Sequence, residues 1–238
     1  MIAVLRRRLA RVHEDQRGVT LVELIVAIGL LGVFTTIVTS LYLSSIQAMS
    51  IGRDVHANSA QASNAINEIT RVIRAGTDNP VQGQSLNNPA FEVAMADKVR
   101  LYAYINLSGA SELPVMIELS VVGGSLVEKR WAATQNAAGY WLFPASTATP
   151  TSTRTIASYV VPSVASGGTQ LFTFLQTNNA AIPIPTGPNG ITDATTLRSI
   201  AAVQVSLTVR ASASDASQQV TLQSTVGIPN LGLARTLS

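Results

Sequence analysis

One carboxylate stands inside the longest apolar run of the chain. Glu23 lies in the stretch RGVTLVELIVAIGLLGVF, five residues after Gly18. From residue 24 to residue 52 no side chain is charged. A charge in hydrocarbon is costly, so charged residues in such segments are rare and mostly functional. Glu23 is therefore the first residue for which a function has to be found.

The residues of common catalytic sites are mostly absent from the sequence. The chain has no cysteine, and its two histidines are His13 and His56. A nucleophile paired with a general base therefore lacks its usual members. We interpret His56 as a solvated helix residue, and Glu112, Glu118 and Glu128 as surface residues of strands or loops. We expect no catalytic residues, no cofactor and no enzyme.

Metal and nucleic-acid binding are also not expected. Asp193 lies among asparagine and glycine in TGPNGITDATT, but one carboxylate is too few for a calcium site. The net charge is +3, and the first 18 residues supply it with five arginines against Glu14 and Asp15. The remaining 11 basic and 11 acidic residues balance. The basic character is thus an N-terminal segment and not a nucleic-acid surface.

The apolar run that contains Glu23 is long enough to cross a membrane. Residues 24–38 are densely apolar, and the run extends through residue 43. A membrane helix needs about 20 mostly apolar residues. Arginines precede the run, so the positive-inside rule places the N-terminus in the cytoplasm. We expect one pass through the cytoplasmic (inner) membrane, with the chain after Arg53 outside.

The same helix is expected to continue beyond the membrane. Apolar residues recur at helical spacing and form one face. They are Val55, Ala62, Ile66, Ile69 and Ile73, with Ala65 and Val72 beside them. No proline lies between residues 19 and 75, and Gly76 is a candidate C-cap. This pattern predicts a nearly continuous helix over residues 19–75, apolar on all sides first and on one side later.

After residue 76 the pattern is that of strands. Seven short segments alternate or are rich in β-branched residues: FEVAM, VRLYAYI, VMIELSVV, SLVEKRW, QLFTFLQ, AAVQVSLTVR and QQVTLQSTVGI. Gly123-Gly124 between two of them predicts a hairpin turn. In VQVSLTV, the three valines and Leu207 should face one way, and Gln204, Ser206 and Thr208 the other. Residues 77–90, 144–169 and 177–198 are expected to be loops.

The stretch RGVTLVELIVAIGLLG resembles the cleavage signal of type IV prepilins and type II secretion pseudopilins. The resemblance implies that prepilin peptidase cuts after Gly18 and N-methylates Val19. Thr20 matches a common second residue of the mature chain, and Glu23 matches the glutamate at its fifth position. Val19 departs from the usual phenylalanine or methionine. Ser40 stands where many major pilins carry a helix-bending proline.

The resemblance also implies a role for Glu23. In a filament it would lie near the N-terminal amine of a neighbouring subunit, and this pairing would compensate its desolvation. Glu23 would then select the correct register during assembly. The later segments AINEITRVIRAGTDNP, ADKVRLYAYIN and PVMIELSVVGGSLVEKRW, with VQVSLTV and VTLQSTVGIPN, resemble minor pilins and J-type minor pseudopilins.

Together these patterns predict an α+β pilin fold, with a long N-terminal helix packed on an antiparallel β-sheet head. The expected parts are a cleaved leader (1–18), an apolar helix (19–53), an amphipathic helix (54–76) and an extracytoplasmic head (77–238). The expected function is that of a minor pilin in a type IV pilus or related filament. Its expected partners are prepilin peptidase, other pilin subunits, an inner-membrane assembly platform and, before assembly, the membrane.

Four alternatives stay open at this point. The first is a minor pseudopilin of a type II secretion system, and the second is a subunit of a competence pilus. The third is a membrane-anchored extracytoplasmic binding domain, which would not need a cut at Gly18. The fourth is a secretory signal peptide cut beyond the apolar run. A signal peptide leaves Glu23 unexplained, so we favour a filament subunit.

Overall fold

The computed structural model describes residues 19–105, 113–145, 147–161, 170–212 and 219–229. The chain divides into two compact units, residues 1–52 and residues 53–238. The helix α2, Leu21–Arg74, begins in the first unit and ends in the second. We refer to residues 53–238 as the head.

The helix α2 has 54 residues and no break, which confirms the prediction of one nearly continuous helix. At about 1.5 Å per residue it is about 80 Å long. Glu23 lies in its first turn, and Arg71 and Arg74 lie in its last turn, where both signs of charge suit the helix dipole. The buried residues of α2 are Asn58, Ala62, Ala65, Ile66, Ile69, Val72 and Ile73.

The prediction of a buried apolar face is wrong for one residue. Val55 is exposed, and burial of α2 begins only at Asn58. Val55 was included in the apolar face because it lies seven residues before Ala62, on the same side of the helix. Spacing alone does not tell how far the packing surface of the head extends along the helix.

The first sheet is antiparallel, with the order β1-β2-β3-β4-β7. Its strands are β1 (Phe91–Ala94), β2 (Lys98–Tyr104), β3 (Pro114–Val122), β4 (Ser125–Ala132) and β7 (Ser152–Ala157). Gly123 and Gly124 join β3 to β4 with φ of 56° and 74°. A two-residue turn with positive φ at both positions matches strand twist, so the predicted hairpin is confirmed.

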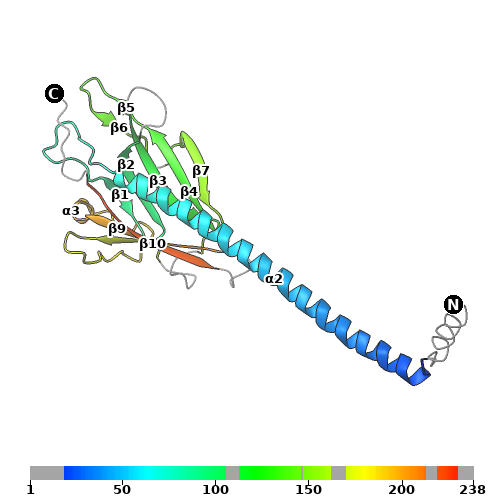
Figure 1. The fold of residues 1–238 in the computed structure, drawn as a ribbon. Helices are drawn as coiled ribbons and strands as arrows, with labels where there is room; N and C mark the ends of the chain where they lie inside the picture. Colours follow the sequence, from blue (N-terminus) through cyan, green and yellow to red (C-terminus); the bar gives the residue numbers. More distant parts are fainter. Residues whose placement is uncertain (1–18, 106–112, 146, 162–169, 213–218, 230–238) are drawn as a thin grey trace, which may run out of the picture. The chain divides into compact units, whose positions relative to one another are not determined.

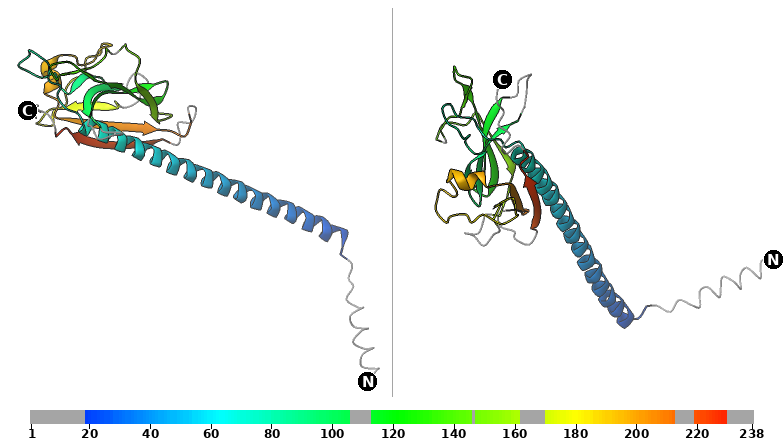
Figure 2. Two further views of the ribbon diagram at one scale, coloured as in Figure 1. Left: turned by 90° about the horizontal axis from the view of Figure 1, so that it is seen from above. Right: turned by 90° about the vertical axis from the view of Figure 1, so that its left-hand side faces the viewer.

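The second sheet has three antiparallel strands in the order β10-β9-β8. They are β8 (Phe172–Leu175), β9 (Ala202–Val209) and β10 (Val220–Gly227). The three valines and Leu207 in the predicted part of β9 are completely buried. Gln204 is half-buried, but Ser206 and Thr208 are also buried and bond to side chains of β10. The prediction of a buried apolar face is confirmed, whereas the prediction of a half-buried strand is wrong over residues 205–209. The head part of α2 runs beside β10 (Figures 1 and 2).

One apolar core joins α2 to both sheets, which gives the α+β architecture expected of a pilin-like fold. Buried side chains from the helix and from the inner faces of both sheets form a single cluster. Phe91 of β1 and Phe174 of β8 meet edge to face, with ring centroids 5.9 Å apart. After β7 the chain crosses to the second sheet, where Val160 pairs with Val209. Tyr159, at this crossing, has φ of 54°, which is unusual for a bulky side chain.

Several elements were missed in segments predicted to be loops. The strand β7 and the helix α3 (Ala194–Arg198) lie in the serine-, threonine- and glycine-rich stretches. A small ribbon of β5 (Thr134–Gln135) and β6 (Trp141–Leu142) was also not predicted. Asp193 caps α3 by accepting a hydrogen bond from the Thr196 N–H at 2.8 Å. It thus has a structural use, and its pKa is lowered by the hydrogen bonds from Thr196.

Gly76 ends the helix in a different way from the predicted left-handed cap. Its φ is not positive, and it pairs instead with Ala103 of β2. A Cβ at this position would lie 2.9 Å from the Ile73 carbonyl oxygen and 3.2 Å from Leu101 Cδ1. Glycine is needed here for close approach of the backbone to the sheet rather than for its conformation.

Candidate functional site

The start of α2 places three of the candidate residues within one turn. Thr20 Oγ1 accepts a hydrogen bond from the Glu23 backbone N–H at 3.2 Å, and the Thr20 carbonyl accepts from Leu24 N–H at 3.0 Å. Thr20 is therefore the N-cap of the helix, and Val19 comes directly before it. Glu23 stands at the third helical position, where a carboxylate is favourable to the helix dipole.

The sequence signal for this cap was overlooked. A threonine followed three residues later by glutamate, ahead of an apolar run, is the pattern of a capping box. Of this pattern, the structure shows the hydrogen bond from the Glu23 N–H to Thr20 Oγ1.

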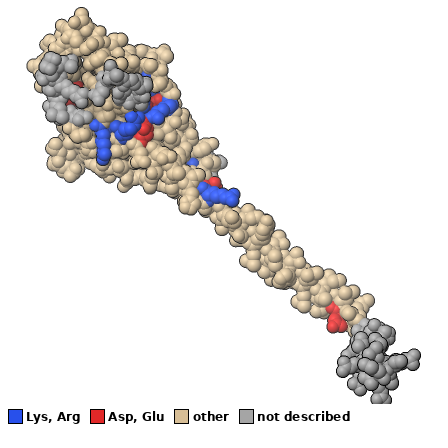
Figure 3. All heavy atoms as spheres, turned by 45° about the horizontal axis from the view of Figure 1, so that its top comes forward, with Lys and Arg blue, Asp and Glu red and all other residues tan. Residues whose placement is uncertain are grey.

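Glu23 has no cation near it along the helix. It is the only charged residue among residues 19–52, and Figure 3 shows this stretch of helix without lysine or arginine atoms. The large apolar side chains around it are exposed, among them Leu21, Val22 and Leu24. Among the described residues of the first unit, no lysine, arginine or histidine can pair with Glu23.

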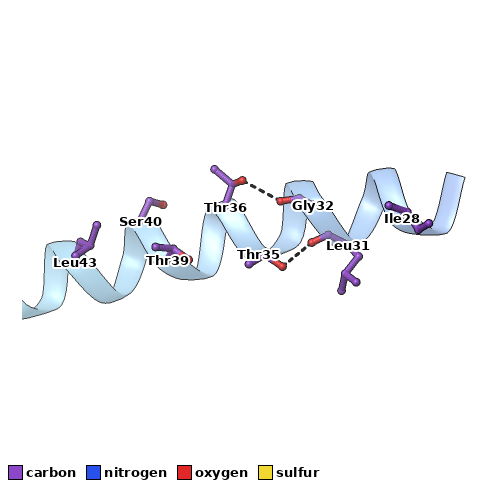
Figure 4. A pocket seen from close by; sticks show the side chains of 8 residues that line it. All are labelled: Ile28, Leu31, Gly32, Thr35, Thr36, Thr39, Ser40 and Leu43. Atoms are coloured by element: carbon purple, nitrogen blue, oxygen red, sulfur yellow. Dashed lines mark hydrogen bonds between the residues drawn. The ribbon is translucent and has the colours of Figure 1, made fainter. Parts of the chain in front are cut away.

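The apolar half of α2 also has a shallow hollow, which Figure 4 shows from close by. It is lined by Ile28, Leu31, Gly32, Thr35, Thr36, Thr39, Ser40 and Leu43. Thr35 Oγ1 donates to the Leu31 carbonyl at 2.7 Å, and Thr36 Oγ1 donates to the Gly32 carbonyl at 2.9 Å. Ser40 Oγ donates to the Ile37 carbonyl at 2.8 Å, and the helix continues straight through this position. These hydroxyls are satisfied within the helix, which suits an apolar environment.

Comparison with known families identifies the segment that holds Glu23. Residues 15–39 match the family model of the prokaryotic N-terminal methylation motif. This motif indicates a pilin- or pseudopilin-type precursor of the kind that prepilin peptidase processes. A search of curated proteins found no match. The motif ends at residue 39, so it says nothing about the head.

The methylation motif and α2 together indicate membrane anchoring. The motif overlaps the part of α2 that is long and apolar enough to cross a membrane. None of the most apolar window of that helix is buried within the protein. Gly18 lies outside the described residues, whereas Val19, Thr20 and Glu23 lie together at the start of α2.

Two carboxylates of the head, Glu118 and Glu128, take part in ion pairs. Among the described residues, no group of three or more His, Asp or Glu side chains could hold a metal ion. The prediction that Glu118 and Glu128 are surface residues is wrong, because both are buried. Glu112 lies outside the described residues. His56 is exposed on α2, as predicted.

Glu128 belongs to an ion cluster between α2 and the first sheet. Its register with Leu119 places it on the core side of the sheet, and its side chain is completely buried. Glu128 pairs with Arg130 and accepts from Arg154 of β7 at 2.8 Å. Glu68 of α2 also pairs with Arg154, and with Arg71 at 2.5 Å. We call these five residues the helix–sheet cluster.

Glu118 is the centre of a second cluster on the opposite face of the sheet. Arg100 Nη2 lies 2.8 Å from Glu118 Oε2, and both side chains are buried. Lys98 and Lys129 lie 3.4 Å and 3.8 Å from the same carboxylate. The Arg100 guanidinium also lies 5.1 Å from the centre of the Trp131 ring. Cross-strand register explains the grouping, since Arg100, Glu118 and Lys129 are direct neighbours.

The helix–sheet cluster should make the stability of the head sensitive to acid. The hydrogen bond from Arg71, with the charge of Arg154, lowers the pKa of Glu68 below the ordinary value of 4.5. A carboxylate with a lowered folded-state pKa stabilises the fold above its unfolded pKa, and this contribution is lost as the pH falls through the folded pKa. We expect Glu68→Gln to melt about 2 to 4 °C below wild type at pH 7, for a loss of about 1 kcal/mol.

Melting curves across pH measure this contribution. The difference in Tm between wild type and Glu68→Gln should shrink as the pH falls below 4.5. Asp97→Asn, outside the cluster, serves as the control for general acid effects. Carboxylates are protonated at about pH 3 or below. A difference in Tm that stays constant down to that pH would show that the charge of Glu68 does not contribute to the stability of the head.

Proposed function

We propose that the chain is a minor pilin, a structural subunit of a type IV pilus or a related filament. The observation that carries the proposal is the methylation motif over residues 15–39, followed by an apolar helix that continues into a β-rich head. The family described by this motif is structural rather than enzymatic. A minor rather than major role is inferred from the size of the head and from its resemblance to minor pilins.

In this proposal the chain has four parts with different fates. Residues 1–18 are a leader that prepilin peptidase removes after Gly18, and Val19 is then N-methylated. Residues 19–53 are the membrane anchor and later the filament core. Residues 54–76 are the helical part of the head, and residues 77–238 form its β-rich extracytoplasmic part. The basic leader lies in the cytoplasm, because arginines precede the apolar run.

Glu23 is proposed to act in assembly. As the only charge among residues 19–52, it has to be neutralised when the helix is surrounded by apolar side chains. The positive N-terminal amine of a neighbouring Val19 supplies that partner. A subunit in the wrong register would leave the carboxylate buried and unpaired, so the pair favours one axial position.

A minor pseudopilin of a type II secretion system is the second candidate. The same motif serves both machines, and the segments around the Gly123-Gly124 hairpin resemble J-type pseudopilins. Such a system crosses an outer membrane, so this candidate requires a host cell that has one.

Mass spectrometry of the mature N-terminus tests the proposed processing. We expect the chain to begin at methylated Val19 in a host with prepilin peptidase, and to keep residues 1–18 when the peptidase gene is deleted. We expect the two hosts to differ completely. With the peptidase the mass should lack residues 1–18 and include the methyl group, and without it the mass should include residues 1–18 and no methyl group. A chain that begins at Met1 in both hosts, or one cut near residue 50, would exclude the proposal.

A further inference from the structure

One part of α2 does not pack on any other described element. The apolar run ends at Leu43, and the first buried residue of the helix is Asn58. None of the residues 44–57 between them is buried. Figures 1 and 2 show no described strand or second helix beside this part of α2. We call residues 44–57, which form about four turns of helix, the neck.

The neck contains Gly52, and neither of the usual reasons for a glycine applies there. Its φ is not positive, and a Cβ at this position would meet no atom from outside its own turn of helix within 4 Å. Gly76 differs, because a Cβ there would lie 2.9 Å from the Ile73 carbonyl oxygen. Alanine would thus fit at residue 52, and it would make the helix more stable than glycine does. The effect of Gly52 in this structure is to weaken the helix.

Other features of the neck also leave the helix weak. Ser50, Asp54 and Val55 are less favourable in a helix than alanine or leucine, and so is His56. Neither Arg53 nor Asp54 has an oppositely charged residue three or four positions away. Ion pairs along the helix therefore do not support this stretch.

The rest of α2 is held in ways that the neck is not. In a bilayer, the backbone bonds of the apolar run cannot be exchanged for bonds to water. Gly29 and Gly32 also leave space for a Cβ, but they lie within that run. From residue 58 onward the helix packs on both sheets, with Ala62 and Ile66 in the core. In the neck, by contrast, the groups of an opened turn can bond to water, and the two compact units of the chain divide there.

We propose that α2 has a hinge at Gly52, where the turn formed by residues 50–54 opens and lets the helix bend. Sharp bends in helices occur at proline, at glycine and serine, and where water enters the backbone ladder. The neck has no proline, but Ser50 and Gly52 lie within one turn and neither is buried. Glycine suits a hinge because it adopts backbone angles that other residues avoid. The bent form is a minor population beside the continuous helix.

The hinge would be used during assembly, and this use rests on the proposed function. Before extraction the apolar helix lies across the membrane, and in the filament it lies among the helices of neighbouring subunits. A bend at Gly52 lets the head turn to meet other subunits while the apolar helix still spans the bilayer. The hinge itself does not depend on the filament, because it follows from the backbone of one chain.

Double electron–electron resonance on the full-length chain in lipid nanodiscs tests the hinge. The chain has no cysteine, so Ser45→Cys and Ser63→Cys place one spin label on each side of Gly52. Both serines are exposed, and in a straight helix they lie on the same side, about 27 Å apart. We expect a main population near this distance and a second population at shorter distances. In Gly52→Ala the second population should fall about fivefold, which corresponds to about 1 kcal/mol.

Ala60→Gly is the matched control. It places a glycine at an exposed position of α2 whose neighbours pack on the sheets, so we expect the distances of wild type. Nanodiscs that hold a single chain exclude packing against another subunit, which is the other use of a glycine in a helix. A single narrow distance in wild type would overturn the hinge. So would a second population that Gly52→Ala leaves unchanged or that Ala60→Gly increases.

Filament assays separate the hinge from the proposed function. Both variants should be cut after Gly18 like wild type. Gly52→Ala should enter sheared filaments about fivefold less, because fewer chains are in the bent form. Equal entry of wild type and Gly52→Ala would exclude a use in assembly. A processed chain that shows one distance would overturn the hinge and leave the function intact, whereas an unprocessed chain that shows both would retain the hinge and exclude the function.

Discussion

Chains with Glu23→Ala are expected to be cut after Gly18 like wild type, but to reach filaments at about a tenth of the wild-type amount or less. The carboxylate is the only charge in residues 19–52, so nothing else on this stretch can pair with a neighbouring N-terminal amine. Losing one partner of a buried pair costs about 3 to 5 kcal/mol. About 1.4 kcal/mol corresponds to a factor of ten in an equilibrium constant. Even a part of this cost would therefore give the predicted loss of the variant from filaments.

Two matched variants separate assembly from helix initiation. Thr20→Ala removes the cap that Thr20 Oγ1 gives to the Glu23 N–H, but keeps the carboxylate. Glu23→Gln keeps the shape and removes the charge. We expect Thr20→Ala to assemble near the wild-type level and Glu23→Gln to resemble Glu23→Ala. Quantitative immunoblots of sheared filaments and of membranes measure both steps. Normal assembly of Glu23→Ala would remove our account of the carboxylate.

The second large effect is expected in the head. Glu128→Ala should lower the free energy of unfolding by about 3 kcal/mol, as for a broken buried ion pair. The Glu128 side chain is completely buried, and Arg130 beside it is nearly so. Without the carboxylate, Arg130 and Arg154 lose the acceptor that they share. Urea unfolding of the full-length chain in detergent, followed by tryptophan fluorescence, measures the loss.

Glu92→Ala is the control for this prediction. Glu92 is a partly exposed carboxylate that lies 3.4 Å from Arg100. Pairs with an exposed partner contribute about 0 to 1 kcal/mol, so the control should change stability little. If both variants lost the same small amount, the helix–sheet cluster would not hold α2 against the sheet.

The long helix and most strands were predictable because local pattern decides them. The unbroken stretch without proline and the spacing of Ala62, Ile66, Ile69 and Ile73 require no knowledge of the partner surface. The buried apolar face of β9 likewise follows from the alternation in its sequence. The strand β7 was missed because its sequence STRTIA lacks an apolar alternation. Only its pairing with β4, far away in sequence, makes it a strand.

The buried charges were not predictable for a related reason. The pattern of one strand alone favours the solvent side for a charged residue. Glu118 and Glu128 were therefore predicted to be surface residues. Arg100 of β2 pairs with Glu118 and Arg154 of β7 pairs with Glu128, and these contacts depend on the register between strands. The segment around Glu23 was recognised from sequence because the methylation motif is entirely local. The capping pattern of Thr20 and Glu23 is also local, and it was overlooked rather than hidden.

The attachment of α2 to the head has a mechanical consequence. Tension applied along the helix would load its contacts with the first sheet in shear. Glu68 is tied to Arg154 of β7, and the Tyr104 N–H to the Ala75 carbonyl, so β7 and β2 would take up the force at separate points. Because α2 is attached at several points along its length, these contacts would have to break together rather than one after another. A head without any disulfide could thus withstand pulling in reducing and oxidising surroundings alike.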